Sequence, residues 1–566
     1  MTAAPAPLPD GVADQAAPLD ALLVDAALGP RHRFVPNAST AKFAADLLLH
    51  PRTTGRRLGA LVTELARVGA KTSTLAPTRH DRRFADPAWV ENPVLRRLVQ
   101  AYLAGGQTTR QLVDDAGLGR RDRQRVSFLV DNILAALSPS NLPLVNPTSA
   151  KAVIDTAGLS LLRGGSNLLR DVATPPRVPE MVDRSAFQVG RDIAVTPGAV
   201  VVRTELLELI QYRPQTAQVH DVPLLVVPPT INKYYVLDLA PGRSLLEHLV
   251  QNGQQVFVIS WRNPDARHAE WGLDTYVQAL LDTFDAVLRI CATDRASIFG
   301  FCSGGIIASL AAAYLASTGD QSRLAALGLG VTVLDFGDAG VAGALVDRRL
   351  AEAAKAKSRR RGYLDGRALA EVFAWLRPDD LVWNYWVNNY LLGRKPPAFD
   401  ILFWNADTTR MSATLHADFV DVAMDNRLVR SAATTVRGVP IDLSEVGVDT
   451  YVVAGIADHL TPWQSCYRST KLLGGTSRFI LSTSGHIAAL VNPPGNPKAT
   501  YQINDENPAD ADTWLKGAET QQGSWWPDLV AWLRDRSGVP KRAPTGLGGR
   551  GVRPLVDAPG TYVFDS

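Results

Sequence analysis

Cysteine is scarce in this sequence: only Cys291, Cys302 and Cys466 occur among its 566 residues. So few cysteines, in an odd number, exclude a disulfide framework, and the lack of any Cys-x-x-Cys pair argues against a structural zinc site. We therefore expect a protein of a reducing compartment. Cys291 and Cys466 fall within predicted helices, where packing is the expected role of a cysteine.

Long apolar runs are also missing. The longest, GGIIASLAAAYLA from Gly304 to Ala316, is shorter than the roughly 20 residues that a transmembrane helix needs. The first residues, MTAAPAPLPDGVADQAAPLD, include acidic side chains but no basic start and no apolar centre, which is unlike a secretory signal. The sequence predicts a soluble, cytoplasmic protein without a membrane span.

An excess of charge of either sign is absent too. The formal net charge is +3, with 46% hydrophobic and 20% charged residues, as in an ordinary globular protein. A weak net charge spread over this length argues against nucleic acid as a partner. The length itself allows more than one domain, at roughly 100–200 residues for each.

Two different sequence patterns divide the chain near residue 182. The first part has apolar residues three and four apart, as in RRLGALVTELARV, which is the spacing of amphipathic helices. After the proline-rich TPPRVPEMV, short apolar runs alternate with helical segments, and this order predicts a parallel sheet covered on both faces. We predict a disordered tail at residues 1–38, a helical domain at 39–182 and an α/β domain at 183–566.

The alternation of strands and helices stops between about residues 337 and 444. We expect this stretch to be a cap inserted over the carboxyl ends of the strands, where it would act as a mobile lid. Its run VWNYWVNNYLL carries more aromatic surface than one solvated helix needs. Part of the run is therefore expected to pack on the α/β domain or on a second copy of the chain, with packing inside the cap as the alternative.

The stretch GFCSGG, which contains Cys302, has the glycine spacing of a nucleophile elbow. Gly300 and Gly304 lie two positions to either side of Cys302, whereas Ser303 would have Phe301 in place of the first small residue. The motif follows an apolar strand pattern and opens an apolar helix pattern, as such a turn requires. Cys302 is the predicted nucleophile, and the backbone N–H of Ser303 is a predicted oxyanion donor. A packing cysteine among glycines is the alternative.

An aspartate and a histidine follow two later strands in the order of an α/β-hydrolase triad. VVAGIADHLTPW places Asp458 just beyond one predicted strand, and ILSTSGHIA places His486 just beyond the next. Asp458 could instead cap the helix that begins near Pro462, and His486 could be a solvated loop residue. His459 is expected to support its neighbour rather than to catalyse. The pattern predicts an α/β-hydrolase fold with an inserted cap, preceded by a mainly helical region.

Several motifs of the chain resemble those of the poly(3-hydroxyalkanoate) synthases. Besides GFCSGG, they are PPTINKYYVLDL from Pro228, SWRNP from Ser260, LVWNYWVNNYLLG from Leu381, ADHLTPW from Ala457, SGHIAALVNPPGNPKA from Ser484 and GSWWPDLVAWL from Gly523. The resemblance covers roughly residues 80 to 540. It departs from the usual form of the family at Ser303, where an apolar or small residue is common.

The resemblance implies an acyltransferase that polymerises (R)-3-hydroxyacyl-CoA thioesters into a storage polyester. It assigns the nucleophile to Cys302, the base to His486 and the acid to Asp458. PPTINK follows a strand where hydrolases place a second oxyanion donor, which makes the N–H of Ile231 the candidate. The resemblance further implies no cofactor apart from the CoA of the substrate, no metal, a homodimer, and a location on polyester granules among granule-associated proteins.

Two other functions stay open at this point. A cysteine-dependent hydrolase, either a thioesterase or a polyester depolymerase, would use the same elbow and triad. A non-catalytic granule-coat protein would need no ordered cysteine, aspartate and histidine at strand ends. The sequence also leaves open whether Asp458 orients His486 or helps to activate a substrate hydroxyl, and which side-chain length the substrate has.

Overall fold

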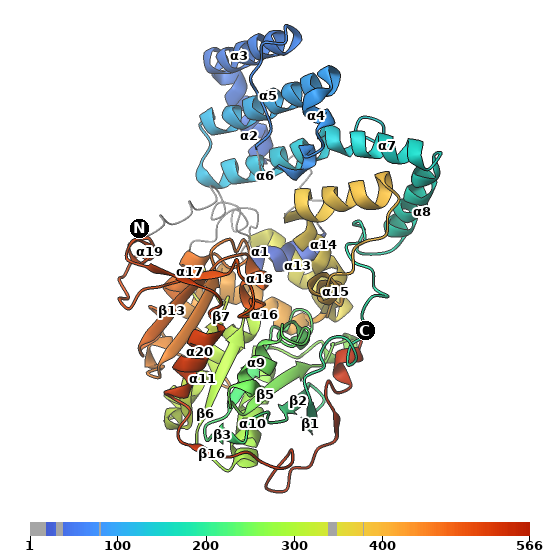
Figure 1. Ribbon diagram of the computed structural model, residues 1–566. Helices are drawn as coiled ribbons and strands as arrows, with labels where there is room; N and C mark the ends of the chain where they lie inside the picture. The colour runs from blue at the N-terminus through green and yellow to red at the C-terminus, as the bar shows by residue number, and fades with distance from the viewer. Residues whose placement is uncertain (1–18, 30–37, 79–80, 338–347, 377) are drawn as a thin grey trace. The chain divides into compact units, whose positions relative to one another are not determined.

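A computed structural model describes residues 19–29, 38–78, 81–337, 348–376 and 378–566, which form two compact units (Figure 1). The sheet unit contains the described parts of residues 1–27, 184–366 and 399–566. The helical unit contains those of residues 28–183 and 367–398. The chain therefore passes from the helical unit to the sheet unit within one residue of the predicted boundary.

An 11-stranded sheet forms the centre of the sheet unit, in the order β15-β14-β13-β12-β7-β6-β4-β5-β2-β1-β17. From β5 to β13 neighbouring strands are parallel, and the strands added at each edge are antiparallel. The parallel strands are β4 (Leu224–Val227), β5 (Val256–Trp261), β6 (Ala296–Phe301), β7 (Leu324–Gly330), β12 (Thr450–Gly455) and β13 (Ser477–Ser482). The antiparallel strands are β1 (Gly198–Arg203), β2 (Leu207–Tyr212), β14 (Thr500–Ile503), β15 (Glu519–Gln522) and β17 (Val556–Asp557).

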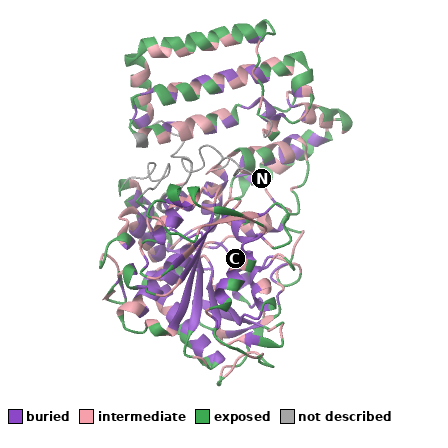
Figure 2. Ribbon diagram, turned by 60° about the vertical axis from the view of Figure 1, so that its left-hand side comes forward, coloured by how far each residue is buried: buried purple, intermediate pink, exposed green. Residues whose placement is uncertain are grey.

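The parallel strands read as continuous apolar runs because both faces of the sheet are covered. Every residue of β4, β6, β7 and β12 is buried, and Figure 2 shows buried residues concentrated in this sheet. Among the covering helices, α10 packs on α11 and α9 packs on α20. Their bounds are α9 (Leu245–Gln251), α10 (Leu273–Cys291), α11 (Ser303–Ser317), α17 (Trp463–Ser469), α18 (His486–Leu490), α19 (Ala511–Lys516) and α20 (Trp526–Arg534). This confirms the predicted α/β architecture.

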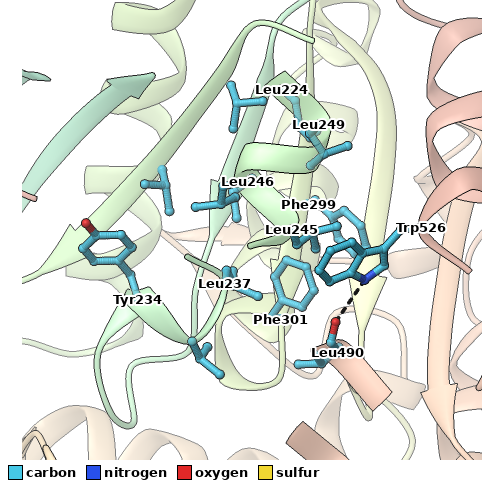
Figure 3. Close-up of a cluster of buried hydrophobic side chains, with 14 of the residues drawn as sticks. Leu224, Tyr234, Leu237, Leu245, Leu246, Leu249, Phe299, Phe301, Leu490 and Trp526 are labelled. Carbon is cyan, nitrogen blue, oxygen red and sulfur yellow. Dashed lines mark hydrogen bonds between the residues drawn. The ribbon is translucent and has the colours of Figure 1, made fainter. Parts of the chain in front are cut away.

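One apolar cluster joins the sheet to α9 and α20 (Figure 3). It includes Phe299 and Phe301 of β6, whose rings stack with centroids 4.4 Å apart. Trp526 of α20 belongs to the same cluster, and its indole Nε1 donates to the carbonyl of Leu490 over 3.1 Å. The strand that leads to Cys302 is therefore fixed by large side chains that have little room to move.

The helical unit begins its helices at recognisable sequence signals. Asn92 and Asn146 each precede a proline, and each side chain accepts hydrogen bonds from the two backbone N–H groups that follow the proline. Proline at the first helical position loses no hydrogen bond, so Asn-Pro is a favourable start. The helices are α2 (Ala38–Leu49), α3 (Pro51–Gly69), α4 (Ala88–Glu91), α5 (Pro93–Asp115), α6 (Arg120–Ala136), α7 (Pro147–Asp155), α8 (Leu159–Ala173) and most of α14 (Gly366–Leu376).

The predicted disordered tail at residues 1–38 needs correction, because helix α1 spans Leu19–Leu28. Leu22, Leu23 and Val24 are buried, and the carbonyl of Leu23 lies 3.2 Å from Nε2 of His416. The run LDALLV thus has enough apolar surface to order a short helix against the sheet unit. Residues 1–18 and 30–37 of the predicted tail lie outside the described residues.

The predicted cap does not form a single body. Helices α13 (Arg348–Arg361), α15 (Asp400–Ala406) and α16 (Ala413–Met424) belong to the sheet unit, whereas residues 367–398 belong to the helical unit. Residues 338–347 of the predicted cap are outside the described part of the chain.

The aromatic run of residues 381–393 packs within the helical unit, against its amino-terminal helices. The alternative of packing inside the predicted cap is met in part, because the ring of Trp383 lies 6.4 Å from that of Trp375. The hydroxyl of Tyr390 donates to Asp171 over 2.9 Å, and Trp386 donates to the carbonyl of Asn141 over 3.1 Å. The amino-acid pattern indicated surplus aromatic surface, but it carried no information on which distant segment covers that surface.

The chain continues in ordered form beyond α20 (Trp526–Arg534). Strand β16 (Pro540–Arg542) pairs with β3 (Gln218–His220), and β17 adds to the sheet edge beside β1. Among the residues that the structure describes, no helix is both long and apolar enough to cross a bilayer.

Replacing Trp514 of α19 with alanine is expected to lower the free energy of unfolding by about 3–5 kcal/mol, because a large side chain leaves a close-packed core. Trp514 is fully buried, with its ring 4.9 Å from that of Phe479 and 5.7 Å from that of Tyr467. Urea unfolding measures the change. Val539→Ala, at a residue 74% exposed, is the control. Equal effects of the two substitutions would contradict the assigned core position.

Candidate active site

Cys302 stands at a sharp turn between β6 and α11. Its backbone has φ 50° and ψ −121°, a region that a residue with a side chain rarely adopts. The turn is held because the N–H of Cys302 donates to the carbonyl of Gly330 over 2.9 Å, while its carbonyl accepts from Gly305 over 2.9 Å. A strained strand-to-helix turn of this form lifts the central side chain above the sheet, as a nucleophile elbow does.

The two glycines of the motif are needed for close backbone approach. A Cβ on Gly300 would lie 2.6 Å from the Cα of Gly305, and one on Gly304 would lie 2.3 Å from the carbonyl oxygen of Pro228. Both distances are far below van der Waals contact, and the obstructing atoms are backbone atoms. The motif therefore brings the elbow against the loop that follows β4.

Asp458 and His486 follow β12 and β13 and meet at the carboxyl edge of the sheet. Nδ1 of His486 lies 2.7 Å from Oδ2 of Asp458, and both side chains are buried. The other oxygen, Oδ1, accepts from the backbone N–H groups of Leu460 and Thr461 at 2.8 and 3.0 Å. Because Asp458 holds Nδ1, the imidazole has Nε2 left, and the interaction of His486 with Cys302 raises the pKa of the imidazole.

The positive charge of His486 and the negative charge of Asp458 stabilise each other. Burial opposes a charge on His486, but the carboxylate and hydrogen bond of Asp458 raise the pKa of the imidazole to about 10, and the interaction with Cys302 acts in the same direction. The carboxyl of Asp458 is also disfavoured by burial, yet His486, the Thr461 hydroxyl and the charge of His459 hold its pKa below the usual value. An imidazolium–carboxylate pair is therefore the stable form at neutral pH.

The predicted oxyanion donors lie on the two segments that meet at the elbow. Ser303 is the first residue of α11, and Ile231 lies in the loop after β4. Within the described residues neither backbone N–H donates a hydrogen bond to the protein. Neither amide is therefore used within the protein, which is one requirement of an oxyanion donor.

Ser303 has a further contact that the sequence did not predict. Its buried hydroxyl oxygen accepts the N–H of Thr230 over 2.9 Å and lies 3.1 Å from the Thr230 hydroxyl. The side chain of Ser303 therefore joins the elbow to the loop that carries Ile231. The sequence did single out Ser303, because the chain departs from the usual form of the resembled family at this position, but it did not predict the contact with Thr230.

Thr461 was also missed by the sequence analysis. Its hydroxyl donates to Oδ2 of Asp458 over 2.6 Å and lies 3.2 Å from Nδ1 of His486. Oδ1 of Asp458 accepts the backbone N–H groups two and three residues further along, which makes a turn of the kind that aspartate side chains often close. ADHLTPW could have suggested this turn, although the role of Thr461 beside the histidine depends on the tertiary fold.

Cys291, Cys466 and His459 are the other cysteine and histidine residues that the sequence analysis considered. Cys291 and Cys466 are buried and form no disulfide, and burial raises the pKa of the Cys291 thiol to about 12 and that of Cys466 well above its usual value. His459 acts on Asp458 through its charge. In the part of the chain that the structure describes, no three His, Cys, Asp or Glu side chains are grouped to hold a metal ion.

Two family models match the chain. Residues 80–249 match the N-terminus of poly-beta-hydroxybutyrate polymerase (PhaC), and residues 223–493 match the alpha/beta hydrolase fold. The second range contains Cys302, Asp458 and His486.

Curated relatives match the chain over most of its length. It is similar to poly(3-hydroxyalkanoate) polymerase 2 of Ectopseudomonas oleovorans, with 46% identity over 91% of this chain and 92% of the relative. It is also similar to poly(3-hydroxyalkanoate) polymerase subunit PhaC of Cupriavidus necator, with 41% identity over 86% of this chain and 83% of the relative. The similarity extends through both units and is not confined to the sheet unit.

Asp458→Asn is expected to remove a stabilisation that depends on pH. The folded-state pKa of His486, about 10, lies above the ordinary value of 6.5, so the stabilisation is fully present below pH 6.5 and is lost as the pH rises through about 10. The loss of unfolding free energy caused by Asp458→Asn should therefore be larger near pH 6.5 than near pH 10, as measured by urea unfolding. Asp505→Asn, at an exposed carboxylate 3.6 Å from Arg478, is the control. A loss independent of pH would contradict the assigned ion pair.

Proposed function

The chain belongs to the poly(3-hydroxyalkanoate) polymerase family, and from this premise we propose that it joins the acyl groups of (R)-3-hydroxyacyl-CoA thioesters into a polyester through a thioester on Cys302. The observation that carries the proposal is the hydrogen-bonded Asp458–His486 pair beside a cysteine at the elbow. A thiol activated in this way is a nucleophile for acyl groups.

Acylation is the first proposed step. His486 holds the proton of the Cys302 thiol, and the thiolate attacks the thioester carbonyl of the substrate. The oxygen of the tetrahedral intermediate is stabilised by the N–H groups of Ser303 and Ile231. The bond from carbon to the CoA sulfur breaks, and the CoA thiolate takes the proton from His486 as it leaves.

Transfer to a hydroxyl is the second proposed step. His486 removes the proton from the hydroxyl of another 3-hydroxyacyl unit, and that oxygen attacks the acyl-Cys302 carbonyl. An ester bond forms, the bond to sulfur breaks, and Cys302 recovers its proton. Sulfur suits this sequence, because exchange of one thioester for another is nearly thermoneutral and keeps the acyl group activated.

We assign Asp458 the role of orienting His486. Its Oδ1 accepts two backbone N–H groups, and its Oδ2 contacts Nδ1 of His486 and the hydroxyl of Thr461. A fully occupied, buried carboxylate has no free lone pair to present to a substrate hydroxyl. This supports His486, and not Asp458, as the base in both steps.

A hydrolase of the same fold remains the second candidate, because water could replace the hydroxyl in the second step. The observation that favours polymerisation is the similarity to named polymerases over both units of the chain. The proposal also includes self-association as a homodimer and a place on the polyester granule, since the product is insoluble and stays attached to the enzyme during growth.

Cys302→Ala is expected to lower CoA release from 3-hydroxybutyryl-CoA and 3-hydroxydecanoyl-CoA by at least about a thousandfold, because the nucleophile is gone. Cys302→Ser should leave a small residual rate, and Cys291→Ala, at the buried last residue of α10, serves as control. CoA release and insoluble polymer are measured together. Free hydroxy acid without polymer would favour the hydrolase, and full activity of Cys302→Ala would overturn the proposal.

Asp458→Asn should slow both chemical steps by a similar factor, roughly 10³–10⁴-fold, if the carboxylate only orients the histidine. Butyryl-CoA, which lacks the 3-hydroxyl, isolates acylation, and mass spectrometry follows acyl-Cys302. Methyl 3-hydroxybutyrate added to the acyl-enzyme isolates transfer to a hydroxyl. Normal acylation with failed transfer would contradict the orienting role and assign Asp458 to the hydroxyl.

A further inference from the structure

The carboxyl-terminal residues 561–565 return to the sheet unit after β17 and are held by a buried glutamate. The carboxylate of Glu208 accepts the backbone N–H and hydroxyl of Thr561 at 2.9 and 2.8 Å and the backbone N–H of Tyr562 at 3.0 Å. Glu208 is itself paired with Arg203 over 2.6 Å. The hydroxyl of Tyr562 donates to the carbonyl of Thr204 over 2.6 Å. This segment is therefore fixed in place by several polar contacts.

Residues 561–565 contact Lys233, which lies two residues after Ile231 in the sequence. The ammonium of Lys233 donates to the carbonyls of Val563 and Asp565 at 2.5 and 3.0 Å and lies 2.9 Å from Oδ1 of Asp407. A lysine has three N–H donors, and these three acceptors match them. Lys233 is only 8% exposed, so its charge is directed at the protein and not at solvent.

The loop from Pro228 to Lys233 is held at several other points. Trp261 donates to the carbonyl of Pro228 over 3.0 Å, and Trp404 donates to the carbonyl of Lys233 over 2.6 Å. Between these ends, Ser303 accepts from the N–H of Thr230. The segment that carries Ile231 is thus held by hydrogen bonds at both ends. At the Lys233 end, two of these hydrogen bonds are made with the carboxyl-terminal residues.

We propose that residues 561–565 bind the ammonium of Lys233 and thereby position the oxyanion loop, which is the loop from Pro228 to Lys233 that carries Ile231. Lys233 is a positioning residue, because all its donors are used within the protein. The proposal rests on the function proposed above, in which the N–H of Ile231 stabilises the oxyanion. A donor has to lie within hydrogen-bond distance of the developing charge, and a displacement of about 1 Å can cost on the order of 100-fold in rate.

Lys233→Met keeps an unbranched side chain that is one atom shorter than lysine, and it removes all three contacts. We expect the rate of acyl-Cys302 formation from butyryl-CoA to fall about 10–100-fold. Alkylation of Cys302 by iodoacetamide forms no oxyanion, so its rate should stay at the wild-type value. This split between acylation and alkylation distinguishes positioning of the oxyanion donor from damage to the thiol, to His486 or to the fold.

Lys541→Met is the matched control. Lys541 also ties the carboxyl-terminal region to the sheet unit, with Nζ 2.7 Å from Asp221 and 3.0 Å from the carbonyl of Cys291. It lies on β16 and not beside the oxyanion loop. Both rates should stay at the wild-type value in Lys541→Met. Thermal unfolding of each variant gives the share of folded protein used in the comparison.

A deletion of residues 561–566 is the second variant, for use also if Lys233→Met does not fold. It removes both carbonyl acceptors but leaves Asp407, and the same selective loss of acylation is expected. Wild-type acylation in either folded variant, or an equal loss of acylation and alkylation, would overturn the positioning role. Failure of the wild-type protein to form any acyl-Cys302 would instead overturn the proposed function.

Discussion

The candidate active site depends on one backbone constraint, the positive φ of Cys302. A non-glycine residue in such a conformation costs on the order of 1–3 kcal/mol and persists only when its surroundings hold it there. Here the carbonyl of Gly330 and the first turn of α11 hold it, and stacked phenylalanines fix the strand before it. The same turn starts α11 at Ser303, and the side chain of Cys302 interacts with His486.

The groups around the sulfur are arranged before any substrate binds. Thr461 and two backbone N–H groups donate to Asp458, which in turn contacts Nδ1 of His486. On the opposite side of the elbow, the Ser303 hydroxyl and the ammonium of Lys233 restrain the loop after β4. Both sets of contacts are buried, where hydrogen bonds are stronger and an unpaired partner is costly. Preorganised polar groups of this kind are what acyl transfer requires of a protein.

The sequence predicted the features that depend on short-range pattern. The parallel strands, the elbow at Cys302 and the chain order of Asp458 and His486 follow from apolar runs and the residues at their ends. Features that depend on contacts between distant segments were missed. The outermost antiparallel strands β15 and β17 are short and polar. Lys233 meets carbonyls more than 300 residues away in sequence, and the aromatic run binds α7 and α8 although it lies inside the predicted cap. Nothing in a local pattern identifies such partners.

The insertion of residues 367–398 in the helical unit has a consequence for synthesis on the ribosome. The amino-terminal part of the helical unit is translated by residue 183, yet the segment containing Trp386 and Tyr390 emerges roughly 200 residues later, which at ~5–20 residues per second is about 10–40 s. During that delay the surfaces that receive these aromatic side chains are uncovered. The helical unit can therefore complete its folding only after the middle of the sheet unit has been translated.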